Sequence, residues 1–217
     1  MKPQLSFFGE DIVFDHSRYA YPSQLACITG TRTFEDHTSS YYGIVLEGGC
    51  TIERDGARFE LIQNMYFGLP GGFQIQNAGK VVLFRRWGYR ALPTFGGPTE
   101  IDGRLSYIDT SRASILIPPA RMGDPVLNLL VFPPNVIQSP HQHPTTRLGC
   151  VISGSGKFVA ETSAPLETGM VFALDPFKIH SFNSGSNGLA VVAYHPDSDV
   201  GPTDELHPMK SRTYLIR

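Results

Sequence analysis

The sequence lacks a charge excess, a long apolar run and a leader-like start. Its 217 residues carry 18 Lys and Arg against 20 Asp and Glu, a net charge of -2, so no basic excess attracts nucleic acid or an anionic membrane. No segment approaches the roughly 20 apolar residues that span a bilayer. The opening MKPQLSFFGEDIVF reaches acidic residues too early for a signal peptide. We expect a cytoplasmic protein without nucleic-acid or membrane partners.

Cysteine usage excludes two further classes. Cys27, Cys50 and Cys150 are odd in number and far apart, and no CxxC pair is present. Disulfide frameworks and structural zinc sites need paired or closely spaced cysteines. We expect reduced, mostly buried thiols.

Helical periodicity is scarce, whereas short apolar runs bounded by Gly, Pro, Asn or Asp recur. They are YYGIVLEG, RFELIQNMYFG, KVVLFRRWGY, LNLLVFPP, RLGCVISG, GMVFALDP and LAVVAYHP. Such runs are typical of strands, so the chain is predicted to be all-β, as a sandwich, jelly roll or barrel. Residues 91–125 lack clean periodicity and are rich in Gly and Pro, which indicates a linker or inter-domain arm.

An internal repeat predicts two domains. EDHTSSYYGIVLEGG (35–49) aligns without a gap with HQHPTTRLGCVISGS (141–155), matching His37 with His143, Gly43 with Gly149, and Gly48 with Gly154. NMYFGLPGGFQI (64–75) matches GMVFALDPFKIH (169–180) after a one-residue adjustment. We therefore predict two similar β domains, residues 1–108 and 109–217.

Three histidines of the second unit form a candidate metal site. On a strand, His141 and His143 would share one face, with Arg147 further along it. His180 ends an apolar run that could pair beside that strand. Three neutral imidazoles would leave coordination positions open for water or substrate. The alternative is three unrelated histidines in turns.

Residues 135–183 resemble a cupin domain, whose two motifs read G-x5-HxH-x3,4-E-x6-G and G-x5-PxG-x2-H-x3-N. His141 and His143 fall on the HxH of the first motif, and Gly154 on its closing glycine. Gly169 falls on the opening glycine of the second motif, and His180 on its histidine. The departures are Asn135 at the opening glycine, Arg147 at the glutamate, Asp175 and Phe177 at the P and G of PxG, and Asn183, which comes one residue early. The resemblance implies two tandem cupin jelly-roll domains, a bicupin, with a three-histidine metal site in the second.

The first unit resembles a cupin more faintly. Gly48, Pro70 and Gly72 match its motifs, but the ligand positions hold Glu35, His37, Tyr41 and Ile75. An isoleucine cannot bind a metal, so we expect this domain to lack one. Glu35 and His37 are interpreted as a vestigial site. They would form a hydrogen-bonded pair or, alternatively, belong to a metal-free small-molecule pocket.

The resemblance also implies chemistry. Three-histidine cupins bind iron(II) for oxygen chemistry, so iron(II) is the favoured cofactor, with Mn, Ni, Zn or Cu as alternatives. An arginine in place of the glutamate ligand makes the site more positive, and Arg147 would either anchor an anionic substrate or turn outward to a surface carboxylate. The expected substrate pocket comprises Arg147, Gln138, Val151, Phe182 and His195.

Three function classes remain open at this level. The favoured one is a non-haem iron dioxygenase acting on a small anionic or enolisable organic acid. The second is a non-redox metal enzyme: an isomerase, cyclase, decarboxylase or lyase. The third is a non-catalytic small-molecule-binding cupin. The expected partner is a small-molecule substrate, and a homodimer is an open alternative to a monomer.

Overall fold

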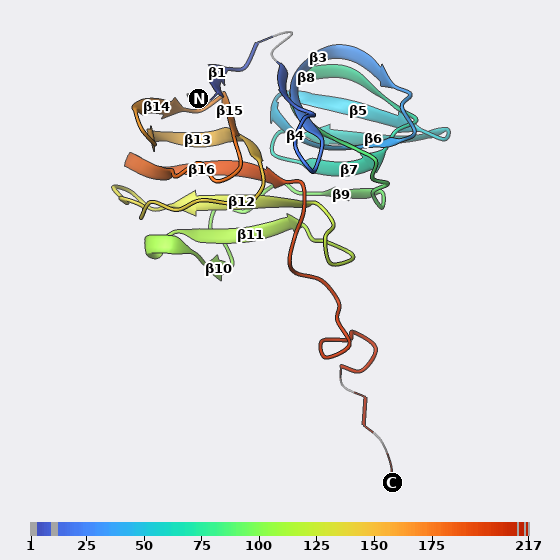
Figure 1. Cartoon of the computed structure of the whole chain (residues 1–217). Coiled ribbons are helices and arrows are strands. Elements are labelled where there is room, and N and C mark those ends of the chain that lie inside the picture. Colours follow the sequence, from blue (N-terminus) through green and yellow to red (C-terminus); the bar gives the residue numbers. More distant parts are fainter. Residues whose placement is uncertain (1–3, 10–12, 212, 215, 217) are drawn as a thin grey trace.

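The chain folds into two antiparallel β-sheets that lie side by side (Figure 1). The structure, a computed structural model, describes residues 4–9, 13–211, 213–214 and 216. The N-terminal sheet contains β2 (Val13–His16), β3 (Ser23–Phe34), β4 (Ser39–Glu47), β5 (Gly49–Arg54), β6 (Ala57–Ile62), β7 (Tyr66–Pro70), β8 (Phe73–Trp87) and β9 (Thr94–Gly96). The C-terminal sheet contains β1 (Gln4–Phe7), β10 (Leu105–Ser106), β11 (Arg112–Ile117), β12 (Val126–Phe132), β13 (Arg147–Val159), β14 (Ser163–Glu167), β15 (Met170–Leu174) and β16 (Ser181–His195). Within these residues, no helix is long and apolar enough to cross a membrane.

The predicted all-β class is confirmed, and each predicted apolar run lies in one or two strands. The main paths run β2-β3-β8-β4-β7-β9 in the N-terminal sheet and β1-β15-β13-β16-β12-β11-β10 in the C-terminal sheet. Residues 91–125, expected to be a linker, instead contain β9, β10 and β11. Two of these strands have only two or three residues, too few for a periodic pattern.

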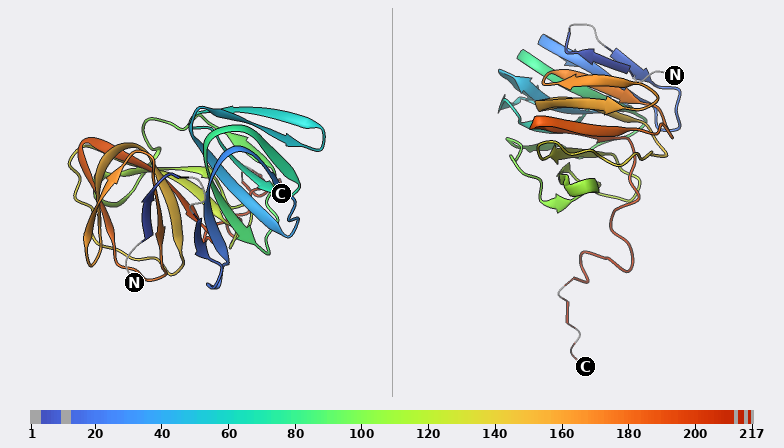
Figure 2. Two further views of the ribbon diagram at one scale, coloured as in Figure 1. Left: turned by 90° about the horizontal axis from the view of Figure 1, so that it is seen from above. Right: turned by 90° about the vertical axis from the view of Figure 1, so that its left-hand side faces the viewer.

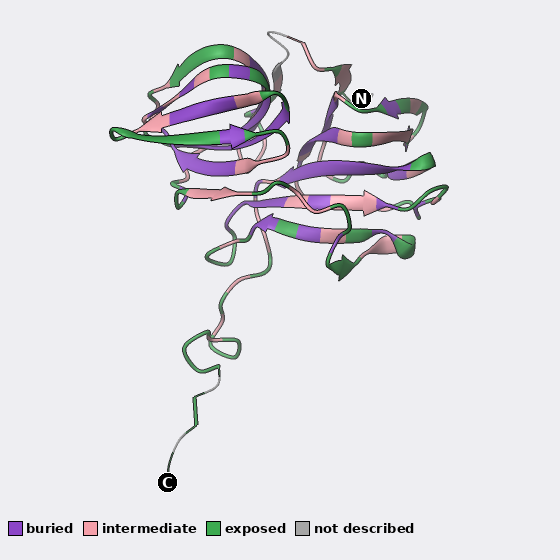
Figure 3. Cartoon of the chain, turned by 180° about the vertical axis from the view of Figure 1, so that it is seen from behind, coloured by how far each residue is buried: buried purple, intermediate pink, exposed green. Residues whose placement is uncertain are grey.

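The core consists of three apolar clusters. Each sheet curls around its own cluster, and a third cluster combines residues of both sheets and holds them together. Figure 2 shows the two curled sheets side by side. Alternate residues of β4 enter different clusters: Tyr42 and Ile44 face the other sheet, and Tyr41 and Val45 face inward. Because successive side chains of a strand point to opposite faces, β4 is buried on both sides, and every residue of it except Glu47 is buried. Figure 3 shows such buried strands in both halves, whereas the segment after β16 is largely exposed.

One glycine–phenylalanine pair occurs at the same place in both sheets. Gly43 lies opposite Phe67 in the β4–β7 register, and Gly149 lies opposite Phe172 in the β13–β15 register. A Cβ added to either glycine would lie 2.3 Å from the ring carbon Cζ of its phenylalanine. Each ring therefore occupies the space of a missing side chain, and the aligned repeat corresponds to repeated packing.

Two strands that precede the predicted domain boundary at residue 108 belong to the C-terminal sheet. β1 pairs with β15, with Leu5 opposite Phe172, and so extends the edge of the C-terminal sheet. β10 pairs with β11 in the same sheet. The N-terminal sheet thus begins at β2 and ends at β9.

The glycine–phenylalanine packing can be tested in the N-terminal sheet, away from the histidines. Gly43→Ala is expected to lower the free energy of unfolding by about 1–3 kcal/mol, because the new methyl group overlaps the Phe67 ring. In a Phe67→Leu background, Gly43→Ala should lower the free energy of unfolding by less, since the ring that the methyl group would overlap is absent. Denaturant unfolding of the four proteins measures this coupling, and an equal cost in both backgrounds would contradict the packing.

Candidate metal centre

Three imidazoles converge at one end of the C-terminal sheet. One ligand atom from each of His141, His143 and His180 lies within 4.8 Å of the others. The ring centroids are 5.1 Å apart for His141 and His143, 4.6 Å for His141 and His180, and 5.2 Å for His143 and His180. The predicted convergence of the three residues is therefore present.

The backbone that carries the histidines is less regular than expected. His141 and His143 precede β13, which begins at Arg147, so they do not lie on a continuous strand. His141 instead forms an isolated bridge with His180: each backbone N–H donates to the other's carbonyl, at 3.0 and 2.9 Å. His180 immediately precedes β16, so this bridge fixes the HxH segment to the start of that strand.

Backbone carbonyls orient two of the rings. Nδ1 of His141 lies 3.0 Å from the Ser139 carbonyl, and Nδ1 of His180 lies 2.8 Å from the Lys178 carbonyl. A neutral imidazole that donates from Nδ1 presents Nε2 as a lone pair. Such hydrogen bonds are typical of metal-binding histidines, because they select the tautomer and the ring orientation.

The site disfavours protonation of its histidines. Burial, followed by the positive Arg147 and the two neighbouring histidines, lowers the pKa of His143 to about 3. Burial lowers the pKa of His180 to about 4, against an opposing hydrogen bond with the Lys178 backbone. These imidazoles are therefore neutral at pH 7, as metal ligation requires.

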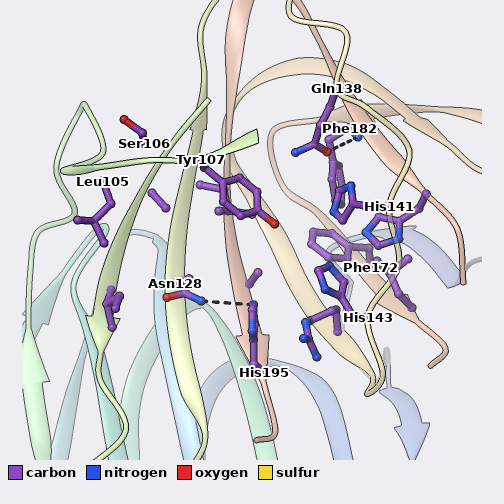
Figure 4. Close-up of a pocket in the computed structure, with 17 residues that line it drawn as sticks. Leu105, Ser106, Tyr107, Asn128, Gln138, His141, His143, Phe172, Phe182 and His195 are labelled. Carbon is purple, nitrogen blue, oxygen red and sulfur yellow. Dashed lines mark hydrogen bonds between the residues drawn. The ribbon is translucent and has the colours of Figure 1, made fainter. Parts of the chain in front are cut away.

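The histidines form one wall of a cavity of about 230 Å³ (Figure 4). The other walls are mostly apolar, and Figure 4 shows Tyr107 and Asn128 across the cavity from His141 and His143. The lining residues that the sequence predicted are Gln138, Arg147, Phe182 and His195. A mostly apolar cavity with a few converging polar groups is the usual form of a small-molecule site.

Arg147 lies at the edge of this cavity and also lines an adjacent chamber with Asp197 and Asp199. Its guanidinium is half-buried, and Nη1 donates to the Thr145 carbonyl and hydroxyl and to the Thr146 carbonyl. Burial lowers the pKa of Arg147 to about 10, against the opposing effect of Asp197, so it stays charged at neutral pH. Its Nε is buried and finds no hydrogen-bond partner among the described residues.

The loop before Arg147 is held by the N-terminal sheet. His16 of β2 is buried and its Nδ1 contacts the Thr146 hydroxyl, which donates to the Leu174 carbonyl at 2.7 Å. Tyr19 donates its hydroxyl to Asp175 Oδ1 at 2.6 Å. The N-terminal sheet therefore supports the segments that flank the histidine site.

The remaining predicted pocket residues differ in their placement. His195 ends β16, lines the cavity and contacts Asn128 through Nε2 and Nδ2 at 3.3 Å. Burial, followed by Arg147 and His143, lowers its pKa well below the usual value. Val151 is fully buried in the apolar cluster of the C-terminal sheet and does not line the cavity.

Tyr107 and Asn128 are among the cavity residues that were not predicted. Tyr107 follows β10 in the segment expected to be a linker, and no local pattern marks it. The turn after it contains two left-handed residues, Asp109 and Thr110, and Asp109 accepts a hydrogen bond from Ser139 N–H beside His141. Asn128 interrupts the apolar run of β12, and that single polar residue was a usable signal for a cavity-facing position.

The aligned positions of the N-terminal sheet are arranged differently. Glu35 and His37 are exposed, and Tyr41 and Ile75 are buried. Tyr41 packs with Phe34 and Phe73, at centroid distances of 5.0 and 5.5 Å, and the Arg85 guanidinium lies 5.7 Å from the Tyr41 ring centroid. Aromatic side chains thus pack around Tyr41, the residue aligned with Arg147.

Comparison with solved structures identifies the architecture. A cupin 2 conserved barrel domain protein from Leptotrichia buccalis superposes with a TM-score of 0.63 at 13% identity, over 88% of this chain and 95% of that one. The chain has the cupin fold. Protein Ylba from E. coli gives a TM-score of 0.64 at 14% identity, over 88% and 84% of the two chains. Salicylate 1,2-dioxygenase from Pseudaminobacter salicylatoxidans gives 0.65 at 10% identity, over 89% and 83%. No protein-family model and no curated protein matches the sequence, so the similarity is one of structure.

The lowered histidine pKa values predict an acid-sensitive metal-free protein. The unfolded chain takes up protons near pH 6.5, whereas folded His143 and His180 resist them down to about pH 3 and 4. Stability is therefore full above pH 6.5 and is lost as the pH falls. We expect the Tm of chelator-treated protein to fall by about 5 °C or more between pH 7.5 and 5. In His180→Gln the Tm should fall less between pH 7.5 and 5 than in the wild type. An equal fall in the variant would contradict the lowered pKa of His180.

Proposed function

We propose that this protein is a metal-dependent cupin enzyme, a non-haem iron(II) dioxygenase acting on a small anionic or enolisable organic acid. The observation that carries the proposal is the histidine site itself, with a charged Arg147 on the cavity wall where many cupins have a ligating glutamate. A neutral three-imidazole site beside a cation favours an anionic ligand. The shared fold with salicylate 1,2-dioxygenase, solved in complex with gentisate, is compatible with this substrate class.

The residues present fit a divalent transition metal. His141, His143 and His180 would hold it, and imidazole suits Fe, Zn, Cu and Ni. When bound, iron(II) supplies the redox chemistry with oxygen, and the protein supplies binding and orientation. Arg147 would hold a substrate carboxylate, Phe172 and Phe182 would exclude water, and Tyr107 would close the opposite side.

We also propose that the two sheets are tandem cupin domains, residues 1–108 and 109–217, and that β1 and β10 of the first segment join the sheet of the second. The repeated glycine–phenylalanine pair in matching registers supports this. The first domain is proposed to hold no metal, because aromatic side chains fill its interior and Ile75 replaces the third histidine.

Oxygen consumption tests the proposed reaction. Iron(II)-loaded protein, supplied with a panel of small enolisable and aromatic hydroxy acids, should consume oxygen with at least one of them, and zinc-loaded protein should not. Conversion of an acid by both metal forms without oxygen uptake would replace the dioxygenase proposal with a non-redox metal enzyme.

Metal content tests the site. We expect about one divalent metal per chain by elemental analysis. His143→Ala should lower metal affinity by orders of magnitude, because a direct ligand is lost. Glu35→Ala and His37→Ala are the matched controls in the aligned unit and should leave metal content unchanged. Full metal content in His143→Ala, or loss of metal in a control, would contradict the assignment.

Substitutions of Arg147 distinguish a role in anion binding from a role in metal binding. Arg147→Lys keeps the charge but loses the fork geometry, so salicylate binding to zinc-loaded protein should weaken by about 1–3 kcal/mol while metal content is unchanged. Arg147→Glu should raise metal affinity, since it restores a carboxylate, and abolish anion binding. Calorimetry measures both, and wild-type behaviour of Arg147→Lys would show that Arg147 does not contact the anion.

A further inference from the structure

Gln138 carries an unused hydrogen-bond donor at the wall of the histidine cavity. Its side chain is only 2% exposed, and it lines the cavity with His141 and His180. The side-chain Nε2 has no hydrogen-bond partner among the described residues. Buried amide nitrogens in native proteins are almost always hydrogen-bonded, so an unpaired one at a cavity wall indicates a missing partner.

The orientation of this amide is set by the protein. Phe182 N–H donates to Gln138 Oε1 at 3.0 Å, which leaves Nε2 on the opposite side. Gln138 N–H donates to Asn183 Oδ1 at 3.1 Å, so the backbone of the residue is also fixed. Figure 4 shows the amide nitrogen directed away from Phe182, toward the side of the cavity where Tyr107 lies. Rotating the amide to relieve Nε2 would place two donors against each other.

We infer that Gln138 forms a separate subsite that donates a hydrogen bond to a neutral oxygen of the ligand, a hydroxyl or carbonyl. The inference rests on the proposed metal and anion site and narrows its substrate class. The ligand would have a chelating, anionic end toward the histidines and Arg147, and a further acceptor oxygen toward Gln138. Because the donor is closed from bulk solvent, an analogue without that oxygen leaves it unpaired and binds more weakly.

The test uses ligands that differ by one hydroxyl. Calorimetry on zinc-loaded protein compares salicylate with 2,3-, 2,4- and 2,5-dihydroxybenzoate, which share its chelating group. At least one isomer should bind about tenfold or more tightly than salicylate. In Gln138→Met this ratio should fall to near one, while salicylate affinity per bound zinc changes little. Gln142→Met, an exposed glutamine between the two histidines, is the control and should keep the wild-type ratio.

The outcomes distinguish this inference from the proposed function. Salicylate binding without any preferred isomer, or with a preference that Gln138→Met retains, overturns the Gln138 subsite and leaves the anion site intact. If none of the four acids binds the zinc-loaded protein, the proposed anion site fails and the subsite fails with it. The ratio is insensitive to a general loss of fold or metal, since both ligands of a pair are measured on the same sample.

Discussion

The reciprocal backbone hydrogen bonds between His141 and His180 join two segments that are distant in the sequence. The convergence of the histidine site depends on this bridge. It sets the distance between the first and third imidazoles, and the Ser139 and Lys178 carbonyls then set how those rings face. These main-chain contacts hold the His141 and His180 imidazoles in a defined arrangement. A preorganised site loses little conformational freedom on binding.

The two halves share a framework but differ in what fills it. Gly43 with Phe67 and Gly149 with Phe172 occupy matching register positions, so the sheets curl in the same way. Inside the N-terminal sheet, aromatic rings pack against one another. The C-terminal sheet instead holds the cavity beside the histidines. The filled half gives its neighbour a rigid support, since His16 and Tyr19 contact the segments on either side of the histidines.

Local patterns in the sequence predict the strands, the repeat and the convergence of the three histidines, because alternation and turn residues act over a few positions. Gln138 and His195, two of the expected pocket residues, line the cavity. Tyr107 could not be predicted, since it reaches the cavity through the pairing of β10 with β11 at a sheet edge, a tertiary relation. Val151, another expected pocket residue, lies in the apolar cluster, because strand alternation gives the face of a residue but not its distance from a cavity.

The pairing of β1, at the start of the chain, with β15 of the C-terminal sheet affects the order in which the protein can fold during synthesis. Gln4–Phe7 leave the ribosome long before β15, the strand they pair with, so this edge of the protein closes only after most of the chain has been made. Until then the early segment has no backbone partner, and β15 without it would present an open edge to other chains. Completion of the C-terminal sheet therefore requires a segment made before β2 to pair with one made after β14, so a product that ends before β15 would contain every strand of the N-terminal sheet but not of the C-terminal sheet.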